Sequence, residues 1–155
     1  MEKMVDKNST IGIAGEYFVA AELTRRGFVA SLTGKNTKAI DILASNKDGS
    51  KSVAIQVKTC NNAKNDKWIM TNSVEKIYSD NLFYVLVNIN EGKMPSYFIM
   101  PSTFLANKIK NEYEKWLSSP GCKGKQHNPT SMRTFVFTDE DEKSRFKEAW
   151  NILGL

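Results

Sequence analysis

The clearest hydrophobic pattern along the chain lies within residues 51–59 (KSVAIQVKT), where Val53, Ile55 and Val57 alternate with Ala54, Gln56 and Lys58. Successive side chains of a strand point to opposite faces of a sheet, so this alternation predicts a strand with one buried face. Gln56 and Lys58 then project together from the other face, about 7 Å apart. The strand therefore pairs a buried apolar face with a polar face that carries an amide and an ammonium group.

Hydrophobic periodicity elsewhere in the chain predicts the remaining elements. We expect strands at residues 28–32, 39–45, 68–70, 81–90, 96–100 and 133–138. We expect helices from Ser9 or Thr10 to Arg26, over residues 101–117 and from Asp139 onward, with a short helical segment at residues 73–78. Asp48-Gly49 separates the second and third strands and is a hairpin signal. The order of elements indicates an α/β fold with a central mixed β-sheet flanked by helices.

Length and charge narrow the classes of function. The 155 residues suit a single domain spanning residues 1–155, and the polar residues 1–8 are expected to fray. The chain holds 22 Lys and Arg against 17 Asp and Glu, which gives a net charge of +5. A basic domain of this size favours an anionic partner, most commonly nucleic acid. A basic surface that serves only solubility stays open as the alternative.

Several classes of protein and of site are disfavoured by what the chain lacks. No apolar run approaches the roughly 18 residues of a membrane-spanning helix, and the first ten residues lack the apolar stretch of a secretory signal. Two cysteines cannot form a disulfide framework or a zinc knuckle, and one histidine cannot build a multi-histidine metal site. We therefore expect a protein of a reducing cytoplasm with no membrane partner.

Three of the expected elements carry side chains with complementary chemistry. Glu16 lies on the first helix, Asp41 on the second strand, and Gln56 and Lys58 on the third. A hairpin between the two strands brings Asp41 beside Gln56 or Lys58. Carboxylate, amide and exposed strand carbonyl oxygens are hard ligands that suit Mg²⁺. A lysine beside such a metal can orient or deprotonate an attacking water.

These motifs resemble the PD-(D/E)xK nuclease superfamily, which has the restriction-endonuclease-like fold, and within it the Holliday-junction-resolvase-like nucleases. Gly15-Glu16 is similar to the superfamily's first helix, and Ile40-Asp41-Ile42-Leu43 is similar to its metal-binding strand. Ile55-Gln56-Val57-Lys58-Thr59 is similar to its (D/E)-x-K strand, and Gln56 follows Asp41 by 15 residues. The resemblance covers roughly residues 11–60, and the rest of the chain only in element order. It implies a core with the order α-β-β-β-α-β.

The resemblance implies metal-dependent hydrolysis of DNA phosphodiester bonds, with branched or structured DNA among the candidate substrates. Asp41 would be the principal ligand of Mg²⁺ or Mn²⁺, the Val57 backbone carbonyl would be another, and Glu16 would bind the metal directly or through water. Lys58 would activate the attacking water. Gln56 stands where the superfamily usually has Glu or Asp, which removes one negative charge that Glu16 could supply. Because nucleases of this fold often dimerise, analogy also implies a homodimer.

Basic residues concentrate around the two strands of the candidate site. Residues 23–67 hold nine Lys or Arg against three Asp or Glu, and such a stretch can bind phosphates through salt-dependent contacts. Lys47 and Lys51 are expected to flank the site. We expect nucleic acid to contact six residues of this part of the chain: Lys35, Lys38, Thr59, Asn61, Lys64 and Lys67.

Three other interpretations stay open on the sequence alone. Asp41 and Lys58 could form a structural ion pair across two strands. The chain could bind nucleic acid on the same fold without cutting it, because Gln56 weakens the metal site. It could also be a protein-interaction or accessory domain whose basic surface contacts an acidic protein.

Overall fold

A mixed five-stranded β-sheet forms the centre of the computed structural model, which describes residues 7–34 and 39–155. Its strands, in the order in which they lie in the sheet, are β1 (Val29–Leu32), β2 (Ile42–Ser45), β3 (Ser52–Cys60), β5 (Leu82–Asn88) and β6 (Ser96–Pro101). Strands β3 and β5 are parallel, and the other neighbouring pairs are antiparallel. The expected α/β class with a central mixed sheet is confirmed.

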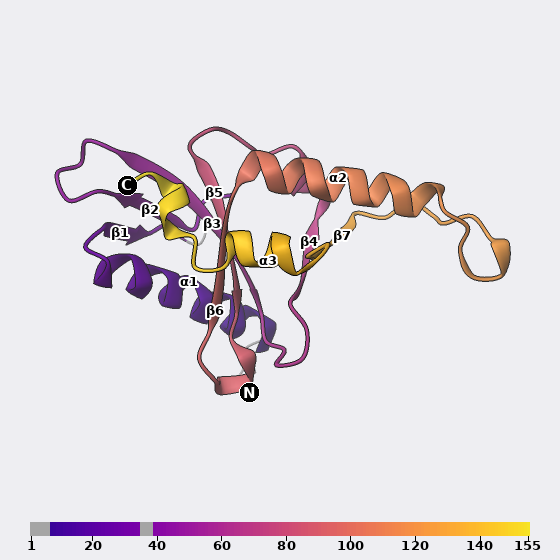
Figure 1. Ribbon diagram of the computed structural model, residues 1–155, viewed down its shortest axis with the longest axis horizontal. Helices are drawn as coiled ribbons and strands as arrows, with labels where there is room; N and C mark the ends of the chain where they lie inside the picture. Colours follow the sequence, from indigo (N-terminus) through magenta and orange to yellow (C-terminus); the bar gives the residue numbers. More distant parts are fainter. Residues whose placement is uncertain (1–6, 35–38) are drawn as a thin grey trace, which may run out of the picture.

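Helix α1 (Lys7–Arg25) covers one face of this sheet (Figure 1). Its buried Val19 and Leu23 belong to one apolar core with Ile55 of β3, as the alternating pattern of that strand predicts. The C-terminal 3₁₀ helix η4 (Trp150–Leu153) contributes to the same core. The apolar face of β3 is therefore the face that packs under α1.

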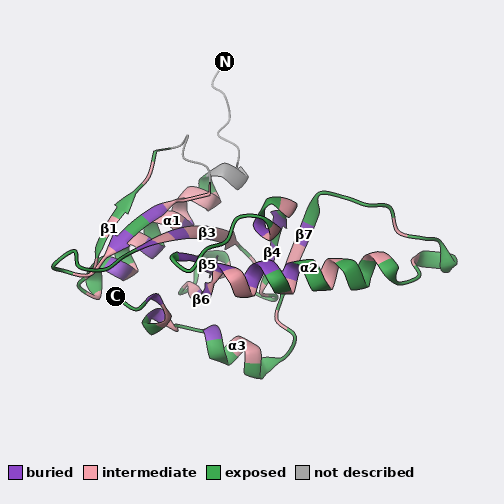
Figure 2. Ribbon diagram, turned by 90° about the horizontal axis from the view of Figure 1, so that it is seen from above, coloured by how far each residue is buried: buried purple, intermediate pink, exposed green. Residues whose placement is uncertain are grey.

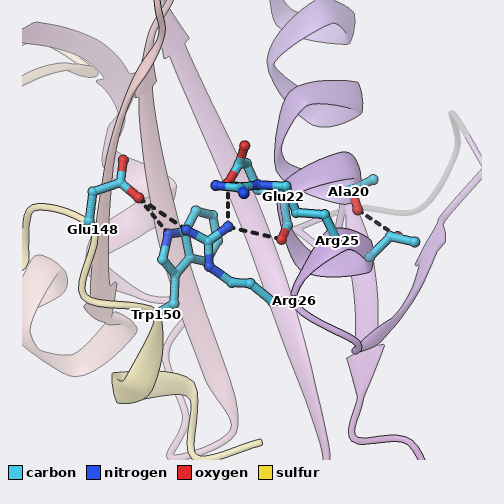
Figure 3. A network of polar contacts seen from close by, with 7 residues as sticks. Ala20, Glu22, Arg25, Arg26, Glu148 and Trp150 are labelled. Atoms are coloured by element: carbon cyan, nitrogen blue, oxygen red, sulfur yellow. Dashed lines mark hydrogen bonds and ion pairs between the residues drawn. The ribbon is translucent and has the colours of Figure 1, made fainter.

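The C-terminal end of α1 is tied to the C-terminal segment by a polar network (Figure 3). Arg26 forms ion pairs with both Glu22 on α1 and Glu148. The indole N–H of Trp150 donates to the same Glu148 carboxylate at 2.8 Å, and the Arg26 guanidinium lies 4.6 Å from the centre of the Trp150 ring. These contacts hold two segments together that are far apart in sequence.

A second layer covers the opposite face of the main sheet. It consists of α2 (Ser102–Ser118) and a two-stranded antiparallel sheet of β4 (Lys67–Thr71) and β7 (Met132–Val136). Trp68 of β4 lies fully inside this layer, and its indole N–H donates to the Val87 carbonyl of β5 at 2.9 Å. Helix α3 (Glu140–Phe146) follows β7 and buries Phe146 in the same core.

The crossover between the parallel strands β3 and β5 differs in detail from the expected order. It contains β4 and then a single 3₁₀ helix, η1 (Asn72–Glu75), where a short helical segment at residues 73–78 was expected. Val74 anchors this turn in the core below α2. The long helix on this face comes from α2, which follows the β5–β6 hairpin.

The second half of α2 and the loop of residues 119–131 project away from the sheets, as both views show (Figures 1 and 2). The loop contains a short 3₁₀ helix, η3 (Cys122–Gly124). His127 of the loop stacks on Trp116 of α2 at 4.1 Å between ring centres. The backbone N–H of Thr130 donates to the Tyr113 hydroxyl at 2.9 Å, so ring stacking and hydrogen bonding fasten the loop to the helix.

The starts of α1 and β2 differ from the sequence prediction, and several other elements begin or end one or two residues from their expected bounds. Helix α1 begins at Lys7, so Ser9 and Thr10 lie inside it. The expected fraying of residues 1–8 is wrong for residues 7 and 8, which are helical, and residues 1–6 lie outside the described part of the chain. Strand β2 begins at Ile42, three residues later than expected, because Ala39 has a positive φ of 69° that a strand cannot contain. Within the described residues, no helix has the length and apolarity needed to span a membrane.

Candidate active site

Asp41 lies directly before β2, at an irregularity in the pairing of β2 with β3. Ile42 is the register partner of Ile55, yet the Asp41 N–H also donates to the Ile55 carbonyl, at 2.9 Å. Two residues of one strand thus oppose one residue of the other, which is the arrangement of a β-bulge. A bulge redirects the side chain of the extra residue, and here that residue is Asp41.

The carboxylate of Asp41 forms the hydrogen bond that follows the last β2–β3 backbone pair. Its Oδ2 accepts the backbone N–H of Val57 at 2.7 Å. Val57 lies beyond the last β2–β3 pair, and its N–H and C=O point to the same side of β3. The Val57 carbonyl oxygen therefore faces the side of the strand on which the Asp41 carboxylate lies.

Gln56 and Lys58 project from the face of β3 that lies opposite α1, as the alternation predicts. Each is half-buried, and neither side chain forms a hydrogen bond or an ion pair with the described residues. Burial lowers the pKa of Lys58, and the nearby negative charge of Asp41 partly opposes this shift. A half-buried ammonium without a direct partner is costly, so it is a candidate functional group rather than a structural one.

The hypothesis of a structural Asp41–Lys58 ion pair does not describe this geometry. No ion pair joins these two described residues, and the Asp41 carboxylate binds the Val57 N–H instead. The charge of Asp41 still acts on Lys58 through space. Asp41 and Lys58 are therefore neighbours that no direct ion pair joins.

Glu16 approaches Asp41 from α1. The preceding Gly15 is buried, and a Cβ at that position would lie only 1.9 Å from Thr59 Oγ1 of β3. This close approach of helix to strand needs a glycine, and it places Glu16 beside the end of β2. Burial raises the pKa of Glu16, and the charge of Asp41 raises it further. Two carboxylates that repel each other in this way favour a cation between them.

The donor set fits a divalent cation that prefers oxygen ligands. The candidate donors are the carboxylates of Glu16 and Asp41, which act on each other through space, together with the amide oxygen of Gln56 and the backbone carbonyl of Val57. Mg²⁺ is bound in proteins by one or two carboxylates together with waters and substrate oxygens, which this set matches. The described residues hold no cluster of three or more His, Cys, Asp or Glu side chains that could bind a metal. A zinc site of the Cys/His type is therefore not formed by this part of the chain.

The residues expected to contact nucleic acid differ in how far they are exposed to solvent. Lys64 and Lys67 are exposed in and after the loop that follows β3. Asn61 is exposed, and its side-chain oxygen accepts the Glu91 N–H at 2.7 Å. The Thr59 hydroxyl is buried against Gly15 and makes no hydrogen bond to the described residues, so it faces α1 rather than the surface. Lys35 and Lys38 lie outside the described residues.

Lys47 and Lys51 do not flank the candidate site. They belong to the β2–β3 turn, at the opposite end of β3 from Lys58, more than about 20 Å away along the strand. The local excess of basic residues between positions 23 and 67 is therefore divided between two ends of the sheet. Proximity in sequence was misleading here because a hairpin carries its turn away from the far ends of its strands.

Tyr84 is a neighbour of the site that the sequence analysis missed. It is the register partner of Gln56 on the parallel strand β5, and its side chain has no exposed surface. Its hydroxyl makes no hydrogen bond to the described residues. Burial, together with the charge of Asp41, raises the pKa of Tyr84 to about 12. One sequence feature could have pointed to Tyr84: it carries the single hydroxyl in the otherwise apolar run from Leu82 to Val87.

Comparison with solved structures identifies the architecture. The bacterial homing endonuclease I-Ssp6803I matches with a TM-score of 0.55 and 16% sequence identity, over 97% of this chain and 94% of its own. The chain has the restriction-endonuclease-like fold. The Holliday junction resolvase Hjc of Archaeoglobus fulgidus also matches, with a TM-score of 0.45 and 16% identity, over 89% of this chain and 96% of its own. The chain matches no family model and no curated protein sequence. The match to the homing endonuclease confirms the fold expected from the sequence resemblance.

Proposed function

We propose that this protein is a metal-dependent nuclease that hydrolyses phosphodiester bonds of DNA. The observation that carries the proposal is the bulge that turns the Asp41 carboxylate toward Val57, beside Glu16 and the unpaired Lys58. In this proposal Asp41, Glu16, Gln56 and the Val57 carbonyl hold Mg²⁺ or Mn²⁺. The bound cation would supply Lewis-acid stabilisation of the charge that develops on the phosphate.

Lys58 has the environment of a group that exchanges a proton with water. Because burial lowers its pKa, a larger fraction of the amine is neutral near pH 7 than for an exposed lysine. The neutral amine can accept a proton from the attacking water. The resulting ammonium then lies beside Asp41 and can stabilise negative charge on the phosphate. Both roles need a group that no fixed ion pair occupies.

The DNA would approach the exposed residues around the end of β3. Lys64 and Lys67 would contact phosphates, with Asn61 beside them, and Lys35 and Lys38 remain part of the proposal from the sequence. Such contacts make affinity fall steeply with salt concentration. We also propose that two copies of the chain associate to cut both strands, by analogy with nucleases of this fold. The two free cysteines suit a reducing cytoplasm.

The proposal is tested by incubating the full chain with supercoiled plasmid, single-stranded DNA and a four-way junction, with Mg²⁺, with Mn²⁺ and with EDTA. We expect cleavage of at least one DNA form with either metal and none with EDTA. Comparison of the three forms identifies the preferred substrate shape. Cleavage that persists in EDTA, or no cleavage of any form, would contradict the proposal.

A second candidate function follows from Gln56, which leaves the site with two carboxylates instead of three. The chain would then bind DNA without cutting it. This function predicts a salt-dependent mobility shift of DNA that is the same with Mg²⁺ and with EDTA. A protein that shifts DNA at low salt and leaves all three forms intact would favour this function over the nuclease.

A further inference from the structure

Gln56 and Tyr84 are two polar side chains without hydrogen-bond partners that lie side by side in the sheet. They are register partners on the parallel strands β3 and β5 and project from the same face. Neither the Gln56 amide nor the Tyr84 hydroxyl bonds to the described residues. Because Tyr84 has no exposed surface, water does not readily satisfy its hydroxyl. A buried hydroxyl in this state is costly unless a neighbouring group pairs with it.

A glutamine at a metal site has a requirement that a glutamate does not have. The two ends of its side-chain amide differ, and only the oxygen can bind a cation, whereas the two oxygens of a carboxylate are equivalent. Asp41 lies on the β2 side of Gln56 and Tyr84 on the β5 side. A partner on the β5 side that accepts the amide N–H therefore turns the amide oxygen toward Asp41.

We propose that Tyr84 becomes this partner when a cation binds: its hydroxyl oxygen then accepts a hydrogen bond from the Gln56 amide, and the amide oxygen is directed to the metal position beside Asp41. Tyr84 is thus a positioning residue that acts through Gln56. This inference rests on the proposed metal site. It also explains how the chain uses an amide where a carboxylate is more usual, since the buried hydroxyl supplies the orientation that a carboxylate does not need.

A double-mutant cycle on metal binding tests this inference. Mn²⁺ affinity is measured by electron paramagnetic resonance, without DNA, for the wild type, Tyr84→Phe, Gln56→Glu and the double variant. We expect Tyr84→Phe to weaken Mn²⁺ binding about fivefold to tenfold when residue 56 is Gln, as expected for one lost hydrogen bond. We expect less than a twofold effect when residue 56 is Glu. Thermal melting of each variant checks that the fold is intact.

The remaining outcomes overturn the inference in distinguishable ways. An equal loss of affinity in both backgrounds would mean that Tyr84 acts through packing or through Lys58 and not through the amide. No loss in either background would show that its hydroxyl has no role in the site. If the wild type binds no Mn²⁺, the proposed metal site fails together with this inference. If the wild type binds Mn²⁺ and only the cycle fails, the proposed nuclease function stands.

Discussion

The Asp41 carboxylate accepts the Val57 backbone N–H at 2.7 Å, just beyond the last residue pair of β2 and β3. One side chain thereby completes the hydrogen bonding of a central strand and faces the candidate metal position. Asparagine at position 41 can still accept the N–H, whereas alanine leaves this N–H without its partner. We expect Asp41→Ala to lower the free energy of unfolding by about 1–3 kcal/mol, and Asp41→Asn to lower it by less than half of that.

The same two variants separate the structural role of Asp41 from its chemical role. Both lack the negative charge, so both are expected to lose metal-dependent cleavage, although only Asp41→Ala is clearly destabilised. Urea unfolding and plasmid cleavage measure the two effects on the same preparations. A fully active Asp41→Asn variant would contradict the assignment of Asp41 as the principal metal ligand.

Glu16 is predicted to destabilise the metal-free protein near neutral pH. Its pKa is raised, so the native state binds more protons than the unfolded state just above the ordinary glutamate value. The stability contributed by Glu16 therefore falls as pH rises through that window.

We expect Glu16→Gln to raise the melting temperature at pH 7 but not at pH 3. We also expect it to bind Mn²⁺ about tenfold more weakly or worse. Melting curves at both pH values, with and without metal, check this; an unchanged metal-induced shift would exclude Glu16 from the site.

Lys58→Met is predicted to give a more stable protein that does not cut DNA. Because the pKa of Lys58 is lowered, the native state binds fewer protons than the unfolded state between the lowered and the ordinary lysine value. Stability therefore rises with pH through that window in the wild type, and methionine removes the cost of the charge below it. We expect a gain of about 0.5–2 kcal/mol in the free energy of unfolding at pH 7.

The exposed Lys51 on the distal turn supplies the control, since Lys51→Met should change neither stability nor cleavage substantially. A Lys58→Met variant that cuts DNA normally would refute the role of the amine.

Gly15→Ala is predicted to push α1 away from β3. The added Cβ would lie 1.9 Å from Thr59 Oγ1, so we expect a loss of about 1–3 kcal/mol and weaker metal binding through displacement of Glu16. Thr59→Ala should restore part of both losses.

Gly12→Ala is the matched control on the same helix. A Cβ there meets nothing within 4 Å, so the substitution should stabilise the helix by up to about 1 kcal/mol. Equal effects of the two substitutions would contradict the close approach at Gly15.

The part of the site that the sequence could predict is the part governed by local periodicity. The alternation around Gln56 and Lys58 is a property of a single strand, so both the strand and its polar face were predictable. The position of Asp41 was predictable only approximately. Its redirection depends on a bulge against Ile55 and a positive φ at Ala39, and neither feature has a hydrophobic signature.

The residues that the sequence could not place depend on packing between distant segments. Thr59 follows the site directly in the sequence, but its hydroxyl turns inward because Gly15 admits α1 so closely. Tyr84 becomes a neighbour of Gln56 only through the parallel pairing of β3 with β5, across a crossover that contains β4 and η1. Lys47 and Lys51 are near the site in sequence and far from it in space. Pairing partners and the direction of a hairpin are properties of the folded chain.

The central claim is that Glu16, Asp41, Gln56 and the Val57 carbonyl form one metal site. A crystal of the full chain soaked in MnCl₂, with diffraction measured for the anomalous signal of manganese, tests it most directly. We expect an anomalous peak between the Asp41 carboxylate and the Gln56 amide oxygen, and its absence in crystals of Asp41→Ala. A wild-type crystal with no peak at that position, or with manganese bound only elsewhere, would contradict this metal site.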